Sequence, residues 1–135
     1  PAKESSQVLY LFESAIDLLS FATMAQEDRL PWRSQHLLSL AGVYQPKKNL
    51  AERRLPLALS QYLRDHREIQ TIYLCLDNDL AGRSAADAIR QQLAGKYVVR
   101  DGFPCQGKDY NDWLCLRKGL PITRTVPKTE RSIAR

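Results

Sequence analysis

Two aspartates separated by one residue, Asp77 and Asp79, follow the apolar, β-branched segment 71–76 and directly precede a helical pattern. Such a segment is typical of a strand buried on both faces of a parallel sheet. Ligands of open α/β sheets bind at the carboxyl ends of the strands. Carboxylate oxygens placed there suit a hard divalent cation such as Mg²⁺. The pair alone is a weak signal, so the positions of the other acids matter.

Acidic residues recur at two further predicted strand-to-helix junctions. Glu13 follows the apolar segment 8–12 and precedes a helical pattern. Asp109 and Asp112 follow the fourth predicted strand, near residues 97–100. Because parallel strands end at the same edge of a sheet, these acids are expected to approach one another. The sequence therefore predicts a site for a hard divalent cation such as Mg²⁺.

Strand and helix patterns alternate along most of the chain. Strands are predicted at 7–12, 36–43, 71–76 and 97–100, and helices at 15–26, 56–66, 80–93 and 110–118. Repeated strand–helix units indicate an α/β fold with a four-stranded parallel sheet and helices on both faces. If Glu13 shares a metal with Asp77 and Asp79, the first and third strands must be neighbours. That condition favours strand order 2-1-3-4.

Length and composition limit the possible functions. A chain of 135 residues can form one domain with a substantial core, expected at 1–119, followed by a basic tail or linker at 120–135. The formal net charge is +5, although acids gather at the predicted strand ends. A basic protein with a local acidic pocket suits a polyanionic substrate held through a metal. Because the chain begins at Pro1, it is expected to be a fragment of a longer protein.

Several other classes of protein are not indicated. The three cysteines include no C-x-x-C pair, so neither a zinc site nor a disulfide framework is predicted, and Cys75 is expected in the core. His36 and His66 are isolated in the sequence and are therefore not expected to bind metal. No signal peptide and no run of about 18 apolar residues is present, which predicts a cytoplasmic protein without a membrane partner.

Three segments together resemble toprim domains, the catalytic metal-binding modules of bacterial-type primases, type IA and type II topoisomerases and several nucleases. The segments are Phe12-Glu13-Ser14-Ala-Ile-Asp17, Asp77-Asn-Asp79-Leu-Ala-Gly82 and Gly107-Lys108-Asp109-Tyr-Asn-Asp112. The resemblance covers about residues 7–118 and implies the Rossmann-like toprim fold. The acids followed by x-A-G-x-x-A-A, together with G-K-D-x-x-D, are most similar to primase-like toprim proteins of plasmids and conjugative elements.

The resemblance also implies roles for individual residues. Glu13 matches the acid/base or metal-contacting glutamate, and Asp77 and Asp79 match the metal ligands. The secondary family positions are matched by Asp17, Lys108, Asp109 and Asp112. Of these, Lys108 lies beside the expected pocket and is expected to contact a phosphate.

The implied activity is phosphoryl or nucleotidyl transfer on nucleic acid, dependent on one or two ions of Mg²⁺ or Mn²⁺. The expected partners are DNA or RNA, nucleotides, and neighbouring domains of the same polypeptide. A toprim-type nuclease and a non-catalytic scaffold that binds metal and DNA are the alternatives.

Helix capping is an alternative role for several of these acids. Ser14 followed three residues later by an acid is a capping-box pattern. The acids with possible capping roles are Asp17, Asp79, Asp109 and Asp112. Gly82, in the first turn of the third predicted helix, costs about 1 kcal/mol of helix stability relative to Ala. Its presence indicates close approach of a backbone or ligand.

A basic connection follows the second predicted strand. It contains Lys47, Lys48, Arg53 and Arg54. Strand–helix connectivity places this connection at the same edge of the sheet as the acids, so we expect it to bind the nucleic-acid backbone. Phosphate contacts of this kind give affinity without sequence specificity. The alternative is an ordinary solvated loop.

Overall fold

The computed structural model describes residues 6–40 and 55–122. Its elements are β1 (Val8–Phe12), α1 (Ala15–Glu27), the 3₁₀ helix η1 (Trp32–Ser34), β2 (His36–Ser39), α2 (Leu57–Asp65), β3 (Thr71–Cys75), α3 (Leu80–Leu93), β4 (Val98–Asp101) and α4 (Tyr110–Arg117). All four predicted strands and all four predicted helices are present, and their bounds agree with the predicted ones to within one residue except at the end of β2. There the prediction is too long, because Leu40 already lies outside the strand, and residues 41–43 fall outside the described ranges.

The four strands form one parallel sheet in the predicted order β2-β1-β3-β4. In this register Phe12, the last residue of β1, lies between Ser39 of β2 and Cys75 of β3. Glu13 and Asp77 therefore leave neighbouring strands at the same edge of the sheet. This edge is also the point where the strand order reverses, since the chain passes from β1 to β2 on one side and later returns to β3 on the other.

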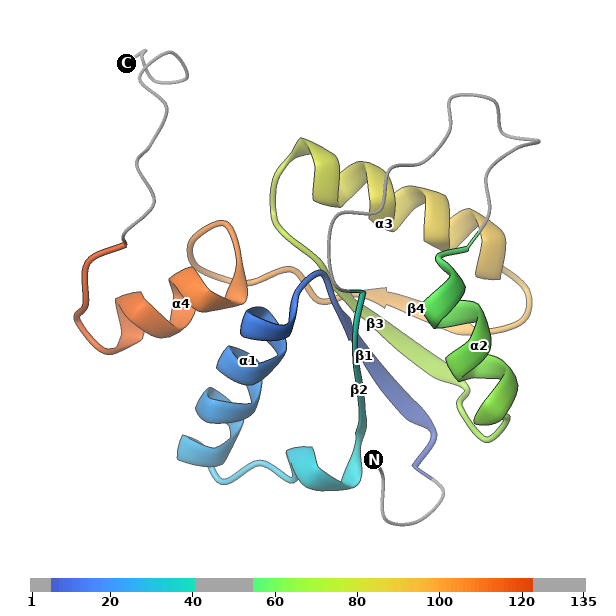
Figure 1. Ribbon diagram of the computed structural model, residues 1–135, viewed down its shortest axis with the longest axis horizontal. Coiled ribbons are helices and arrows are strands. Elements are labelled where there is room, and N and C mark those ends of the chain that lie inside the picture. The colour runs from blue at the N-terminus through green and yellow to red at the C-terminus, as the bar shows by residue number, and fades with distance from the viewer. Residues whose placement is uncertain (1–5, 41–54, 123–135) are drawn as a thin grey trace.

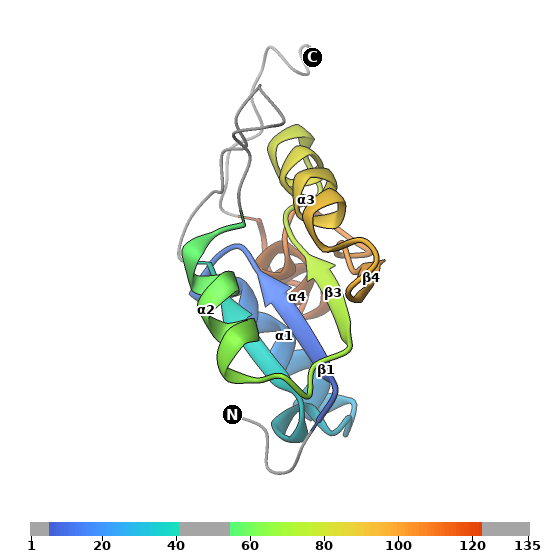
Figure 2. The ribbon, with the colours of Figure 1, turned by 90° about the vertical axis from the view of Figure 1, so that its right-hand side faces the viewer.

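Helices cover both faces of the sheet, with α1 and α4 on one face and α2 and α3 on the other (Figures 1 and 2). Successive side chains of a strand point to opposite faces, so β1 and β3 supply both cores. On the α2/α3 face the core contains Leu9, Leu11, Ile72 and Leu74 from the strands with Leu59, Leu63, Ala85 and Ile89 from the helices. On the α1/α4 face it contains Phe12 and Cys75 with Met24 and Tyr110. The sheet is thus held rigidly between two layers.

Ion pairs join the carboxyl-terminal ends of α1 and α4. Arg117 pairs with Asp28 and Lys118 pairs with Glu27, the residues at the end of α1. Exposed pairs of this kind contribute at most about 1 kcal/mol each to stability.

Two predictions from composition can be compared with the described part of the chain. All three cysteines are unpaired, and Cys75 is buried in the core as expected. Burial raises the pKa of the Cys75 thiol to about 12, so this thiol is inert. Among the described helices, none combines the length and apolar character needed to cross a membrane.

Gly82 allows the first turn of α3 to pack directly on the backbone of the preceding strand end. A Cβ atom at this position would lie 1.9 Å from the carbonyl oxygen of Asp77. The Gly82 N–H also donates to Asp79 Oδ1 at 2.7 Å, which makes Asp79 the N-cap of α3. The close approach expected from the sequence is therefore present, and a backbone atom makes it.

Gly82→Ala is expected to destabilise the protein. Higher helix propensity would contribute about 1 kcal/mol in favour of Ala. The clash is with backbone and cannot be relieved by a rotamer change, so we expect a net loss of about 1–3 kcal/mol of unfolding free energy in urea. Ser84→Ala, on the exposed face of α3, is the matched control and should stay within about 0.5 kcal/mol of the parent. A Gly82→Ala protein as stable as this control would contradict the close approach.

Candidate metal centre

Glu13 and Asp77 are joined directly across the ends of β1 and β3. The Glu13 side chain is 8% exposed, and its Oε1 atom accepts a hydrogen bond from the Asp77 N–H at 3.4 Å. The two acids predicted from neighbouring strands are therefore in contact. This contact depends on the parallel pairing of β1 with β3.

Three carboxylates from three strand–helix junctions meet beside this contact. Asp17 lies in the first turn of α1, Asp77 follows β3, and Asp109 is the N-cap of α4. One oxygen from each can be chosen so that all three lie within 4.8 Å of one another. We call this group the acidic centre. The sequence assigned Asp17 and Asp109 only secondary positions, and the structure brings both beside Asp77.

Asp17 is held in place from two helices. Its Oδ2 atom accepts from the Ser14 hydroxyl at 2.9 Å, and its Oδ1 atom accepts from the Asn111 N–H of α4 at 3.1 Å. Ser14 Oγ in turn accepts from the Asp17 N–H at 3.4 Å, so the predicted cap of α1 is present. With 3% exposure, Asp17 both completes a cap and fixes the start of α4.

Asp79 contacts α3 and Lys108 through its two carboxylate oxygens. While Oδ1 caps α3, Oδ2 lies 3.4 Å from Lys108 Nζ. The described structure therefore gives Asp79 a capping role and an ion pair. Its predicted role as a metal ligand is untested by these contacts.

The loop before α4 folds tightly around Asp112, which is 3% exposed. Asp109 Oδ1 accepts from the Asp112 N–H at 2.8 Å, and Asp112 Oδ2 accepts from the Lys108 N–H at 2.9 Å. Gly107 has a φ of +76°, and a Cβ there would lie 2.4 Å from the Cβ of Asp112. The Asn78 N–H donates to the Lys108 carbonyl at 2.6 Å, which links this loop to the end of β3. The loop positions Asp109 and Lys108 together.

Burial and like charges raise the pKa values of the clustered acids. The pKa of Asp77 rises to about 7, chiefly because the carboxyl is desolvated and then because Glu13 and Asp17 repel its charge. Desolvation is also the main cause of the raised pKa values of Glu13 and Asp17. A divalent cation would relieve this repulsion, and the donors are the carboxylate oxygens that hard cations prefer. The residues present therefore fit a divalent metal.

The four predicted basic residues lie outside the described part of the chain. Lys47, Lys48, Arg53 and Arg54 belong to the segment 41–54, which connects the carboxyl end of β2 with α2. Their predicted contact with nucleic acid stays a prediction.

The prediction that the two histidines are isolated is wrong. The ring centroids of His36 and His66 are 4.9 Å apart, and Glu68 contacts both rings. In the sequence, only the short His66-x-Glu68 spacing signals this group. His36 joins it through a tertiary contact between β2 and α2, which the sequence does not reveal.

Comparison with known proteins agrees with this geometry. A model of the Toprim-like family matches residues 10–114. The chain belongs to the Toprim-like family. The match spans Glu13 and all three members of the acidic centre, and toprim domains bind divalent metal and act on nucleic acid. A search of curated proteins found no match.

The Toprim-like domain should lose stability as pH rises when no divalent metal is present. The folded-state pKa of Asp77 is raised from 3.8 to about 7. Between these values the folded carboxyl holds a proton that the unfolded one has released, so this stabilisation is complete at low pH and is lost as pH rises through about 7. Because Asp77 is partly exposed, we expect a loss on the order of 1–2 kcal/mol between pH 5 and pH 8.

Thermal unfolding in a chelating buffer measures this effect. Asp77→Asn should show a flatter pH profile and higher stability than the parent at pH 8. Asp87→Asn, which removes an exposed acid of α3, should keep the parent profile. If Asp77→Asn has the same pH dependence of stability as the parent, Asp77 is excluded as the main source of that dependence.

Proposed function

We propose that this domain is the toprim module of a primase-like protein and takes part in nucleotidyl transfer on DNA or RNA, dependent on Mg²⁺ or Mn²⁺. The observation that carries the proposal is the acidic centre, in which ligand oxygens from three strand–helix junctions lie within 4.8 Å of one another. The primase-like assignment is supported by the segments that follow Asp79 and Gly107. A cytoplasmic location, where nucleic acid and nucleotides are present, is part of the proposal.

Asp77 is the central metal ligand of this proposal because two sets of acids share it. The sequence grouped it with Glu13 and Asp79, and the fold groups it with Asp17 and Asp109. Bound divalent cations would neutralise phosphate charge and stabilise the attacking and leaving oxygens of an in-line displacement. The carboxylates themselves would hold and orient the ions.

Glu13 is suited to move a proton at this site. It lies against the Asp77 backbone, and burial raises its pKa, so it holds a proton more readily than an exposed carboxylate does. A buried carboxyl with a raised pKa can act as a general acid or base. Contact with a metal is the other role that its position supports.

Lys108 is suited to bind a phosphate. Its side chain is 41% exposed, and its Nζ lies 3.4 Å from Asp79 Oδ2. The ammonium is thus held beside the acidic centre and remains open to solvent. Lys47, Lys48, Arg53 and Arg54 would extend this positive surface along a nucleic-acid backbone.

Metal titration by calorimetry tests the site. We expect the parent to bind Mg²⁺ or Mn²⁺ and Asp77→Asn to lose this binding. Asp79→Asn and Asp109→Asn then separate the two acid sets, because Asn keeps the helix caps while removing a charge. Loss of binding in Asp109→Asn would favour the fold-defined set, and loss in Asp79→Asn the sequence-defined set. No binding by the parent, with or without DNA, would overturn the proposal.

Nucleic-acid binding tests the basic segment. Replacing Lys47, Lys48, Arg53 and Arg54 together with Ala should weaken binding of duplex DNA. Because each phosphate contact contributes about 0.9 to the slope of log K against log salt, the slope should fall by up to about 3.6. Arg64→Ala, an exposed charge near the end of α2, is a single-site control and should leave the slope almost unchanged. Unchanged affinity in the fourfold variant would exclude this segment as the contact surface.

Activity assays distinguish the remaining alternatives. Extension of a nucleic-acid strand that Asp77→Asn abolishes would support the primase-like reaction. Metal-dependent strand cleavage would indicate a nuclease. Metal and DNA binding without turnover would indicate a scaffold or a need for other domains of the same polypeptide.

A further inference from the structure

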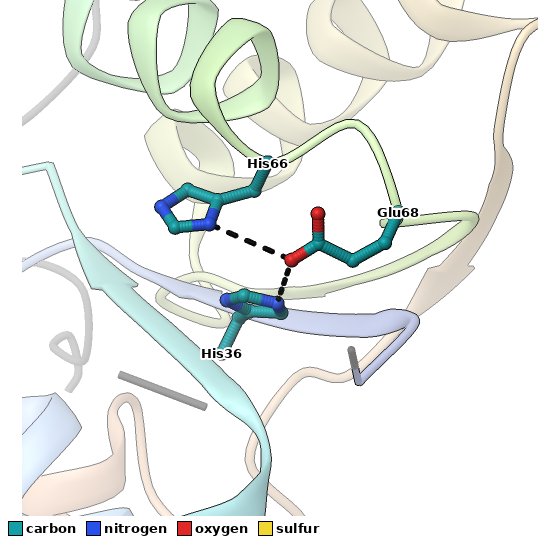
Figure 3. Close-up of side chains that lie close together, drawn as sticks. All are labelled: His36, His66 and Glu68. Atoms are coloured by element: carbon teal, nitrogen blue, oxygen red, sulfur yellow. Dashed lines mark ion pairs between the residues drawn. The ribbon is translucent and has the colours of Figure 1, made fainter. Parts of the chain in front are cut away.

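A second group of ligand side chains lies at the opposite edge of the sheet, where β2 and β3 begin (Figure 3). His36 is the first residue of β2, His66 is the C-cap of α2, and Glu68 lies in the connection from α2 to β3. One ligand atom from each lies within 4.8 Å of the others. We call this group the histidine site.

We propose that the histidine site binds one Zn²⁺ ion. Glu68 Oε2 lies 3.1 Å from His36 Nε2 and 3.6 Å from His66 Nδ1. Ligand atoms bound tetrahedrally to Zn²⁺ at 2.0–2.1 Å are about 3.3 Å apart. The two distances lie on either side of this value, and the ligand atoms of all three side chains lie within 4.8 Å of one another, so small side-chain movements would let one ion contact all three.

The donor atoms of the histidine site favour Zn²⁺ over the Mg²⁺ that suits the acidic centre. Two imidazole nitrogens and one carboxylate oxygen form a recognised Zn²⁺ ligand set. Mg²⁺ prefers an all-oxygen environment, such as the acidic centre provides. The two edges of the sheet therefore differ in the metal that they select.

His36 is already oriented for this role. Its side chain is 2% exposed, its Nδ1 lies 2.7 Å from the Tyr62 hydroxyl, and its Nε2 lies 3.1 Å from the Ser6 carbonyl. A tyrosine hydroxyl can donate or accept. Without metal, Nε2–H donates to Ser6 O or Glu68 while Tyr62 donates to Nδ1. With metal, Nδ1–H donates to Tyr62 and leaves the Nε2 lone pair for the ion, an outer-shell contact typical of metal-bound histidine.

The other two ligands leave the site accessible. The side chains of His66 and Glu68 are each 32% exposed, so an ion can enter from solvent and a water molecule can complete its coordination. The bound ion would tie β2, α2 and the start of β3 together. An ordinary ion pair between Glu68 and the histidines is the competing explanation, and it requires no metal.

Zinc titration of the full chain separates these explanations. Zn²⁺ alone, added after chelator treatment, should bind with one equivalent at the histidine site and raise the melting temperature by mass action. Binding should weaken at least about tenfold in His66→Gln and in Glu68→Gln, and by about tenfold in Tyr62→Phe. His66 and Glu68 are chosen because replacing the buried His36 could unfold the protein. Circular dichroism without metal verifies the fold of each variant.

Two control variants exclude other zinc ligands. Asp77→Asn removes a member of the acidic centre, and Cys105→Ser removes an exposed thiol. Both should keep the equivalent of Zn²⁺ that His66→Gln loses. Absence of zinc binding by the parent would overturn the proposal, as would parent-like binding in both His66→Gln and Glu68→Gln. Loss of the equivalent in either control variant would assign the ion to a different site.

Discussion

Several carboxylates are crowded together where the strands of the sheet end, and the rest of the structure depends on this constraint. Glu13, Asp17 and Asp77 are buried or partly buried, close together and of like charge, and their raised pKa values record the unfavourable energy of that arrangement. Backbone N–H groups offset part of this unfavourable energy by donating hydrogen bonds to the carboxylates. The Asn111 N–H donates to Asp17 and the Asp77 N–H donates to Glu13. A bound divalent cation would offset the remainder.

Close backbone packing prevents the acids from moving apart to relieve the repulsion. The first turn of α3 rests on the Asp77 carbonyl because residue 82 has no side chain. The loop before α4 closes on the side chain of Asp112, because Gly107 has no side chain that would clash with it. The hydrogen bond from the Asn78 N–H to the Lys108 carbonyl then joins the two strand-to-helix connections. The acidic centre is therefore preorganised by backbone geometry, as a metal-binding site requires.

The same residues serve the fold and the site. Asp109 caps α4 and also offers an oxygen to the acidic centre, and Asp79 caps α3 while its other carboxylate oxygen lies near Lys108. Capping and ligand binding use different oxygen lone pairs, so the two interpretations of these acids are compatible. Helix N-termini also favour negative charge, which lowers the cost of placing acids there. This shared role explains why acids gather where helices begin.

Local sequence determined the order of elements and the edge at which the acids gather. The strands, the Ser14 and Asp79 caps and the parallel connections depend on short-range periodicity and chain direction. All are present, although β2 ends earlier than predicted. The strand order also followed, because Glu13 and Asp77 can meet only if β1 adjoins β3.

Tertiary structure decided the contacts that join helices to one another or to distant strands. Asp17 joins Asp77 and Asp109 because α4 packs against α1, a contact that no local pattern encodes. His36 and His66 come together because the carboxyl end of α2 lies against the start of β2, although the residues are far apart in the sequence. The directions of these side chains and the packing of the helices depend on how the cores on both faces of the sheet are filled. Periodicity therefore placed each residue at its edge of the sheet, and only the folded packing paired it with its neighbours.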